Sequence, residues 1–112
     1  MTLINLTPHD ITIFAKEGTI VLPGSDKPAR LEENTVYGWC VQHDGIEVKL
    51  PIVSYGQVFN IPDPDRTKQL IVSQMVAQAL PDRLDLFYPY DMVRDNKGVI
   101  LGCRSLAQWR AS

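Results

Sequence analysis

The sequence predicts a small α+β domain that is rich in antiparallel hairpins, with one or two short helices in its C-terminal half. Three observations predict this class. The first half alternates short apolar runs with clusters of turn-forming residues, Asp44-Gly45 separates two strand-like runs, and apolar side chains recur at helical spacing only within residues 72–80. A length of 112 residues fits a single domain over residues 1–112, because two cores could not both be buried in so short a chain.

The first quarter of the chain is predicted to form short strands joined by turns. Each expected strand is an apolar run bounded by Gly, Pro, Asp or Lys. The expected strands are residues 3–6, 11–14, 19–22 and 29–32. The segment 23–28 is dense in turn formers and is expected to be a loop that places Arg30 at its far end.

A hairpin is predicted in the middle of the chain. Residues 35–42 are rich in β-branched and aromatic residues, and residues 46–50 alternate strictly between apolar and polar. Asp44-Gly45 lies between them, and both positions tolerate the positive φ of a tight turn. The strand-like pattern continues over residues 52–61, until the Pro-rich segment 62–65 ends the first half.

The second half changes from strand to helical spacing and back. Residues 70–72 read as a buried strand, and Ser73 is expected to cap a helix that ends at Pro81. A second short helix is expected from Asp82. A further hairpin is expected with its turn at residues 95–98, and the tail at residues 105–110 reads as a short helix or a frayed end.

Several classes of function lack support in the sequence. Neither the G-x-G-x-x-G motif of dinucleotide-binding proteins nor the G-x-x-x-x-G-K-[ST] motif of P-loop enzymes occurs. The G-x-S-x-G motif of serine hydrolases is also missing. His9 and His43 lie in expected turns, without the further ligands that a metal site needs. We therefore expect no catalytic residues, no metal and no cofactor. Cys40 and Cys103 are far apart in the sequence, and we expect both to be reduced, with Cys103 a buried structural residue.

Charge and hydropathy limit the partners. A formal net charge of −2 disfavours sequence-independent binding to polymeric nucleic acid. No stretch approaches the roughly 20 apolar residues that span a bilayer, and the first residues lack the pattern of a secretory signal. We therefore expect no membrane partner and a protein that stays in the compartment where it is made.

Arginine is the most informative residue type. Four arginines lie near expected element boundaries, and Phe87 stands close to two of them in the sequence; the four are Arg30, Arg83, Arg94 and Arg104. Arginine guanidinium groups that hydrogen-bond to phosphates, beside an apolar or aromatic side chain that packs against a base, would make a nucleotide pocket. From residue chemistry alone, surface ion pairs with the neighbouring aspartates are the favoured interpretation of the same arginines, because exposed arginine beside aspartate is common.

Several segments together resemble a family of small phage and prophage proteins that includes the Thoeris anti-defence signal sponges. The resemblance covers nearly the whole chain. It is carried by Asn5-Leu6-Thr7-Pro8-His9-Asp10-Ile11, Lys27-Pro28-Ala29-Arg30, Tyr55-Gly56-Gln57-Val58, Ile71-Val72-Ser73, Arg83-Leu84-Asp85, Val93-Arg94-Asp95 with Gly98, and Gly102-Cys103-Arg104.

The resemblance implies a protein of the infected bacterial cytoplasm that sequesters glycocyclic ADP-ribose without degrading it. It also implies a homo-oligomer, a hexamer built from dimers, and for some members a second site for cyclic trinucleotides of CBASS defence. Arg30 and Arg104 match the positions that clamp the phosphates. Met75 and Asp85 match the positions that hold the base and ribose, and Phe87 and Arg94 complete the expected ligand-binding set.

Two alternatives remain open. A phage structural or assembly protein with no nucleotide ligand would also suit a compact β-rich domain with exposed edge strands. An enzyme that degrades a nucleotide signal is the third reading, and it would release a product where a sponge releases the intact ligand.

Overall fold

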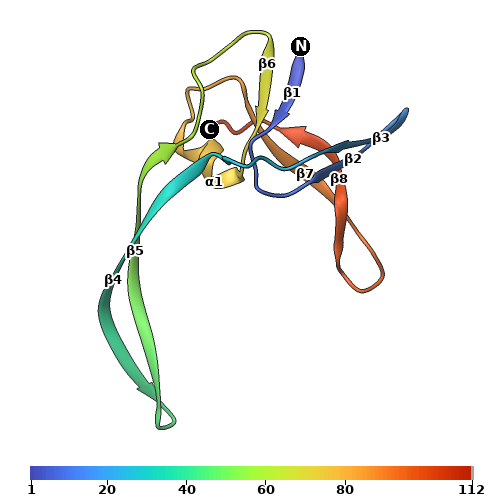
Figure 1. The fold of residues 1–112 in the computed structure, drawn as a ribbon. Helices are drawn as coiled ribbons and strands as arrows, with labels where there is room; N and C mark the ends of the chain where they lie inside the picture. The colour runs from blue at the N-terminus through green and yellow to red at the C-terminus, as the bar shows by residue number, and fades with distance from the viewer. Residues whose placement is uncertain (112) are drawn as a thin grey trace.

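The computed structural model describes residues 1–111, which contain a six-stranded sheet, one short helix and a separate two-stranded hairpin (Figure 1). The elements in chain order are β1 (Thr2–Asn5), β2 (Ile11–Ala15), β3 (Gly18–Leu22), β4 (Arg30–His43), β5 (Ile46–Phe59), β6 (Lys68–Ile71), α1 (Gln74–Ala79), β7 (Leu86–Arg94) and β8 (Ile100–Ala107). The strand order across the large sheet is β1-β6-β7-β8-β2-β3. The prediction of a β-rich chain with hairpins and a short C-terminal helix is confirmed.

The large sheet is mixed, whereas the sequence predicted antiparallel hairpins. Strands β2–β3 and β7–β8 pair antiparallel across short turns. Strand β6 lies parallel to both β1 and β7, and β2 lies parallel to β8. Parallel partners are far apart in the chain and leave no turn signal between them, so the local sequence pattern could not indicate these pairings.

The single helix of the described residues begins where the sequence predicted. The Ser73 hydroxyl accepts a hydrogen bond from the Val76 amide at 3.2 Å, which satisfies one of the unpaired donors at the helix start. The second helix expected from Asp82 does not form, because residues 81–85 make turns that lead directly into β7. No helix within residues 1–111 is long and apolar enough to cross a membrane.

The C-terminal tail extends the sheet, so the expected helix or frayed end at residues 105–110 is wrong for the first part of that range. Strand β8 continues to Ala107, which pairs with Tyr88, and Ser105 pairs with Tyr90. A strand partner in β7, rather than the intrinsic preference of the tail, therefore determines its structure.

The core consists of two buried clusters. One lies where α1 packs against the sheet and is made of Ala29, Leu70, Val72, Val76, Ala77, Leu86 and Tyr88. The other contains Ile11, Ile13, Ile71 and Cys103. Cys103 is buried as predicted, and burial raises the pKa of its thiol, which disfavours the nucleophilic thiolate at neutral pH.

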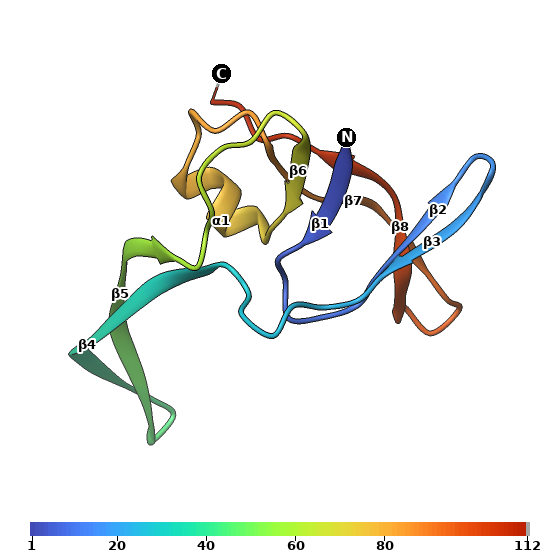
Figure 2. The same cartoon turned by 45° about the horizontal axis from the view of Figure 1, so that its top comes forward.

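The hairpin of β4 and β5, which we call the arm, stands away from the sheet in both views (Figures 1 and 2). Each of its strands has 14 residues. The radius of gyration of the Cα atoms is 17.5 Å, whereas a compact chain of this length would have about 13 Å. The arm thus makes the molecule elongated, with extents of 56 × 39 × 32 Å.

Candidate functional site

A pocket of about 360 Å³ lies at the root of the arm, between the first residues of β4, the last part of β5 and the start of α1. The residues that line it are Ala29, Arg30, Leu31, Glu33, Tyr55, Ser73, Met75 and Val76. Three segments that are far apart in the sequence therefore meet here. We call it the root pocket.

Both strands of the arm are fixed to the sheet domain at this point. The Ala29 amide donates to the Leu6 carbonyl at 2.8 Å, and the Asn60 side chain donates to the Pro28 carbonyl at 3.2 Å. Leu31 and Val58 pack against the buried cluster under α1. These contacts hold one wall of the root pocket against the sheet domain, whereas the arm beyond it projects away from the sheet.

The root pocket combines one cation with apolar and aromatic surface. Arg30 is exposed and forms no ion pair within residues 1–111. Met75 and Tyr55 are 44% and 52% exposed, so each presents apolar surface to solvent. Glu33 pairs with Tyr55 across the arm and adds a carboxylate acceptor. This composition suits a ligand with an anionic group and a flat ring.

Arg30 and Met75 are the only two of the six predicted ligand-binding residues that line the root pocket. Tyr55 and Glu33 were missed as site residues. Tyr55 belongs to a segment that carried the family resemblance, yet residues 52–61 read as an ordinary strand. Only the position of the arm root beside α1 brings Tyr55 to Met75, and nothing in the local sequence indicates it.

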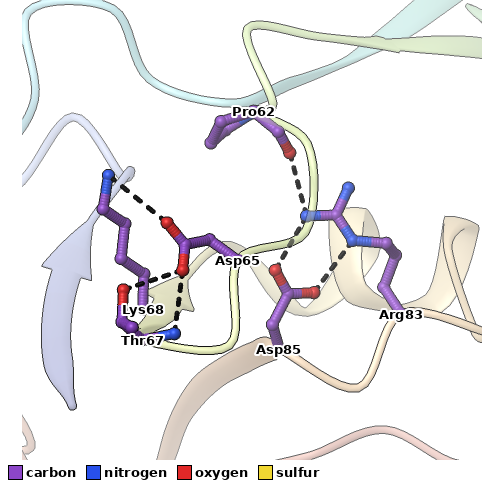
Figure 3. A network of polar contacts seen from close by, with 6 residues as sticks. All are labelled: Pro62, Asp65, Thr67, Lys68, Arg83 and Asp85. Atoms are coloured by element: carbon purple, nitrogen blue, oxygen red, sulfur yellow. Dashed lines mark hydrogen bonds and ion pairs between the residues drawn. The ribbon is translucent and has the colours of Figure 1, made fainter.

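Asp85, predicted as a ligand-binding residue, forms an ion pair with Arg83 outside the root pocket. Its carboxylate accepts two hydrogen bonds from Arg83, at 2.8 and 2.9 Å, and the same guanidinium donates to the Pro62 carbonyl at 2.9 Å (Figure 3). Both side chains are largely buried. Hydrogen bonding to Arg83 lowers the pKa of Asp85, and this bidentate pair ties the segment before β7 to the loop before β6.

The loop before β6 is also held by Asp65 (Figure 3). Its carboxylate accepts hydrogen bonds from the amide and hydroxyl of Thr67, at 2.9 and 2.7 Å, and lies 3.9 Å from the Lys68 amine. The hydrogen bonds from Thr67 lower the pKa of Asp65. A second, larger pocket of about 610 Å³ lies beside this network and includes Arg66 and Asp85.

The remaining predicted residues lie on β7 and β8. Arg104 is exposed and its Nη1 lies 3.3 Å from Oδ1 of Asp91, while Arg94 donates to the Gly98 carbonyl at 2.9 Å in the turn of the hairpin. Phe87 is half-buried in β7, at the position that pairs with β6. Neither Arg104 nor Arg94 lines the root pocket. One chain by itself does not place the two expected phosphate-binding arginines in one pocket.

The first segment that carried the resemblance has a structural role. Asn5 is buried, and its amide nitrogen donates to the carbonyls of His9, Leu22 and Pro23 at 2.8 to 3.1 Å. Its Oδ1 accepts from the amide and hydroxyl of Thr7 at 2.9 and 2.7 Å. Asn5 thus holds the turn between β1 and β2 against the end of β3.

The comparisons with known proteins identify no relative. No protein-family model, no curated protein and no solved structure matches this chain. Its function must be inferred from its own residues.

Proposed function

We propose that the protein binds a small cyclic nucleotide signal, glycocyclic ADP-ribose of Thoeris defence, and sequesters it without degrading it. The observation that supports this best is the root pocket, where an unpaired arginine lies beside a methionine and a tyrosine on a fixed wall. The proposal also draws on the resemblance to phage anti-defence sponges. It includes the related possibility of cyclic oligonucleotides of CBASS as a second ligand class.

The root pocket supplies a matching group for each part of such a ligand. The Arg30 guanidinium can donate forked, charge-assisted hydrogen bonds to a pyrophosphate. Tyr55 offers a ring and Met75 a polarisable sulfur against which an adenine can pack. The Glu33 carboxylate can accept hydrogen bonds from base amino groups or ribose hydroxyls.

A second copy would complete this site. The volume of about 360 Å³ is near the lower end of the range for pockets that bury most of a small ligand, and Met75 and Tyr55 remain half-exposed. Arg104 lies outside the pocket, on β8. We therefore propose that Arg104 reaches the ligand from a neighbouring subunit of a homo-oligomer, a hexamer built from dimers, in the cytoplasm of the infected host.

A sponge needs tight binding and slow release, and burial of the ligand between subunits would provide both. The mechanism has no chemical step. The nucleotide enters with its phosphates against Arg30 and its base between Met75 and Tyr55, and closure by the second subunit retains it.

The test is retention of intact ligand. The purified protein is mixed with glycocyclic ADP-ribose, free ligand is removed by filtration, the protein is heat-denatured, and the released molecule is identified by mass spectrometry. We expect the unaltered ligand in stoichiometric amount. A modified product would instead establish the enzyme reading.

Arg30→Ala should weaken retention by roughly 10- to 100-fold, because a hydrogen-bonded charge contact contributes about 1.5–3 kcal/mol. Arg66→Ala is the matched control, since it removes one arginine that lines the larger pocket instead. Loss of binding in Arg66→Ala with retention in Arg30→Ala would move the site to that pocket. Retention by both variants would contradict both placements.

The phage structural or assembly reading is favoured by one observation, the long exposed arm. Under that reading the wild-type protein would retain neither glycocyclic ADP-ribose nor a cyclic trinucleotide. The same filtration experiment with both ligands therefore separates the two functions.

A further inference from the structure

The two faces of the arm differ sharply in chemistry. Directly opposed residues of an antiparallel pair point to the same face, so the register assigns every side chain of the arm to one side. The register shifts between Tyr37 and Trp39, where Gly38 is the extra residue in β4. On one face the apolar residues are, in opposed pairs, Val36 with Ile52, Trp39 with Leu50 and Val41 with Val48, followed near the tip by Ile46, whose opposed residue is His43.

These seven residues form an uninterrupted apolar surface, which we call the stripe. The opposite face, which we call the polar face, carries Cys40 opposite Lys49 and Gln42 opposite Glu47 towards the tip, and Tyr37 opposite Pro51 and Thr35 opposite Val53 nearer the root. The Lys49 amine lies 5.6 Å from the centre of the Tyr37 ring, which belongs to this polar face. The bulge at Gly38 keeps Trp39 and Val41 on the same side as Val36, because a strand without it would turn both residues to the other face.

The stripe is unusually exposed for its composition. Its side chains are between 42% and 73% exposed, with Trp39 the most exposed. Seven such side chains in one run make an apolar patch of roughly several hundred Å², the size that marks an interaction site on a monomer. An isolated two-stranded hairpin is also only marginally stable in water, so the arm gains stability from a partner.

The charges of the arm favour one kind of partner. Residues 30–59 contain Arg30 and Lys49 against four acidic residues, and the turn itself carries Asp44. An anionic membrane surface would require the opposite balance. The stripe holds no charged residue, so placing two identical stripes face to face opposes no like charges.

We propose that the stripe packs face to face against the stripe of a second copy of this chain, forming a two-fold symmetric pair of arms. Trp39 and Leu50 lie near the middle of each stripe and form the centre of the contact. An interface of this kind is self-complementary, because the same patch serves both subunits. The pairing rests on the homo-oligomer of the proposed function and names one surface that would hold it together. It does not depend on any nucleotide, so the molar mass without ligand tests the pairing and ligand retention tests the nucleotide site separately.

The first test is the molar mass in solution, measured by size-exclusion chromatography with light scattering over a range of concentrations. The wild type should be at least dimeric at micromolar concentration, and Trp39→Lys should lose the contact between arms and halve the measured mass or reduce it further. Gln42→Lys is the matched control, because it adds the same charge to the polar face beside Glu47 and should keep the wild-type mass. A monomeric wild type, or an unchanged mass in Trp39→Lys, would overturn the proposal.

The second test distinguishes arm-to-arm contact from an arm that lies on the partner's sheet domain. In a Cys40→Ser background, Leu50→Cys should crosslink between subunits with a short bismaleimide, whereas Lys49→Cys on the polar face should not. The other cysteine, Cys103, is buried and present in both variants, so any crosslinking through it would be the same in both. An assembly that stays intact while Leu50→Cys fails to crosslink would assign the stripe to another surface and overturn the arm pairing.

Discussion

Buried Asn5 shows how one polar side chain can organise several turns. Five hydrogen bonds satisfy its amide, and they connect residues next to β1, β2 and β3. A Cβ at Gly24 would lie 2.7 Å from the Pro8 carbonyl oxygen, so the loop after β3 can approach this turn so closely only with glycine at that position.

Asn5→Ala should lower the free energy of unfolding by about 2–4 kcal/mol, because it removes all the hydrogen bonds that a buried side chain makes to the surrounding turns. Urea denaturation followed by circular dichroism would measure the change. Asn34→Ala is the control on the exposed arm, and we expect it to stay within about 0.5 kcal/mol of the wild type. Equal stability of both variants would show that water replaces the Asn5 amide.

The Arg83–Asp85 ion pair should make the stability of the protein depend on pH. Asp85 has a lowered pKa in the folded protein, so its contribution to stability is fully present above the unfolded value of about 3.9 and is lost as the pH falls through the folded pKa. Asp85→Asn should therefore lower the free energy of unfolding by about 1–3 kcal/mol at pH 7.

The difference between wild type and Asp85→Asn should shrink in urea denaturation as the pH is lowered from 5 towards 2, roughly the range over which such a carboxylate titrates. Asp82→Asn is the control, because Asp82 is exposed and makes no ion pair within residues 1–111. A difference that is independent of pH would mean that the pair acts through packing alone.

At the scale of elements, the contact between β2 and β8 holds the β2–β3 hairpin to the rest of the sheet. A Cβ at Gly102 would lie 2.5 Å from the Thr12 carbonyl oxygen, and the Cys103 sulfur lies 3.7 Å from the same atom. The two strands thus approach closely at this point, next to the buried cluster around Ile13.

Gly102→Ala should cost about 1–3 kcal/mol of stability, since the added methyl group overpacks a backbone contact. Gly18→Ala is the matched control, because a Cβ there meets nothing within 4 Å and should change stability by less than about 0.5 kcal/mol. Thermal unfolding of the two variants side by side would measure the difference. A small effect in both would show that β2 can shift away from β8 at little cost.

The elements that sequence predicts well are those whose signal is local. Asp44 and Gly45 both adopt positive φ, at 48° and 78°, as the tight turn of the arm requires. The N-cap of α1 at Ser73 is likewise indicated by the residues next to it in the sequence. The pairings of β1 with β6 and β2 with β8 join distant residues and were not predicted. The same holds for the candidate site. The sequence indicates Arg30 and Met75 as candidate binding residues, but only the tertiary structure places them in one pocket with Tyr55.

At the scale of the whole molecule, the arm determines the shape. Residues 46–50 of the arm alternate between apolar and polar, a pattern typical of a strand with one buried face. A single chain leaves that apolar face exposed, so only a partner could bury it. Once Trp39→Lys has produced a monomer, small-angle scattering should give a radius of gyration at or slightly above 17.5 Å, with the arm extended. A value near 13 Å, expected for a compact chain, would mean that the arm folds back onto its own sheet.

The strand order also sets the sequence in which the parts of the protein can form during synthesis. The arm pairs residues 30–59 with one another, so it can close early, whereas β1 must wait for β6 and β2 for β8. The stripe is therefore complete while the sheet domain is still unfinished. Neighbouring nascent chains on one messenger could join by their arms at that stage, and each sheet would then fold on a subunit that already has its partner.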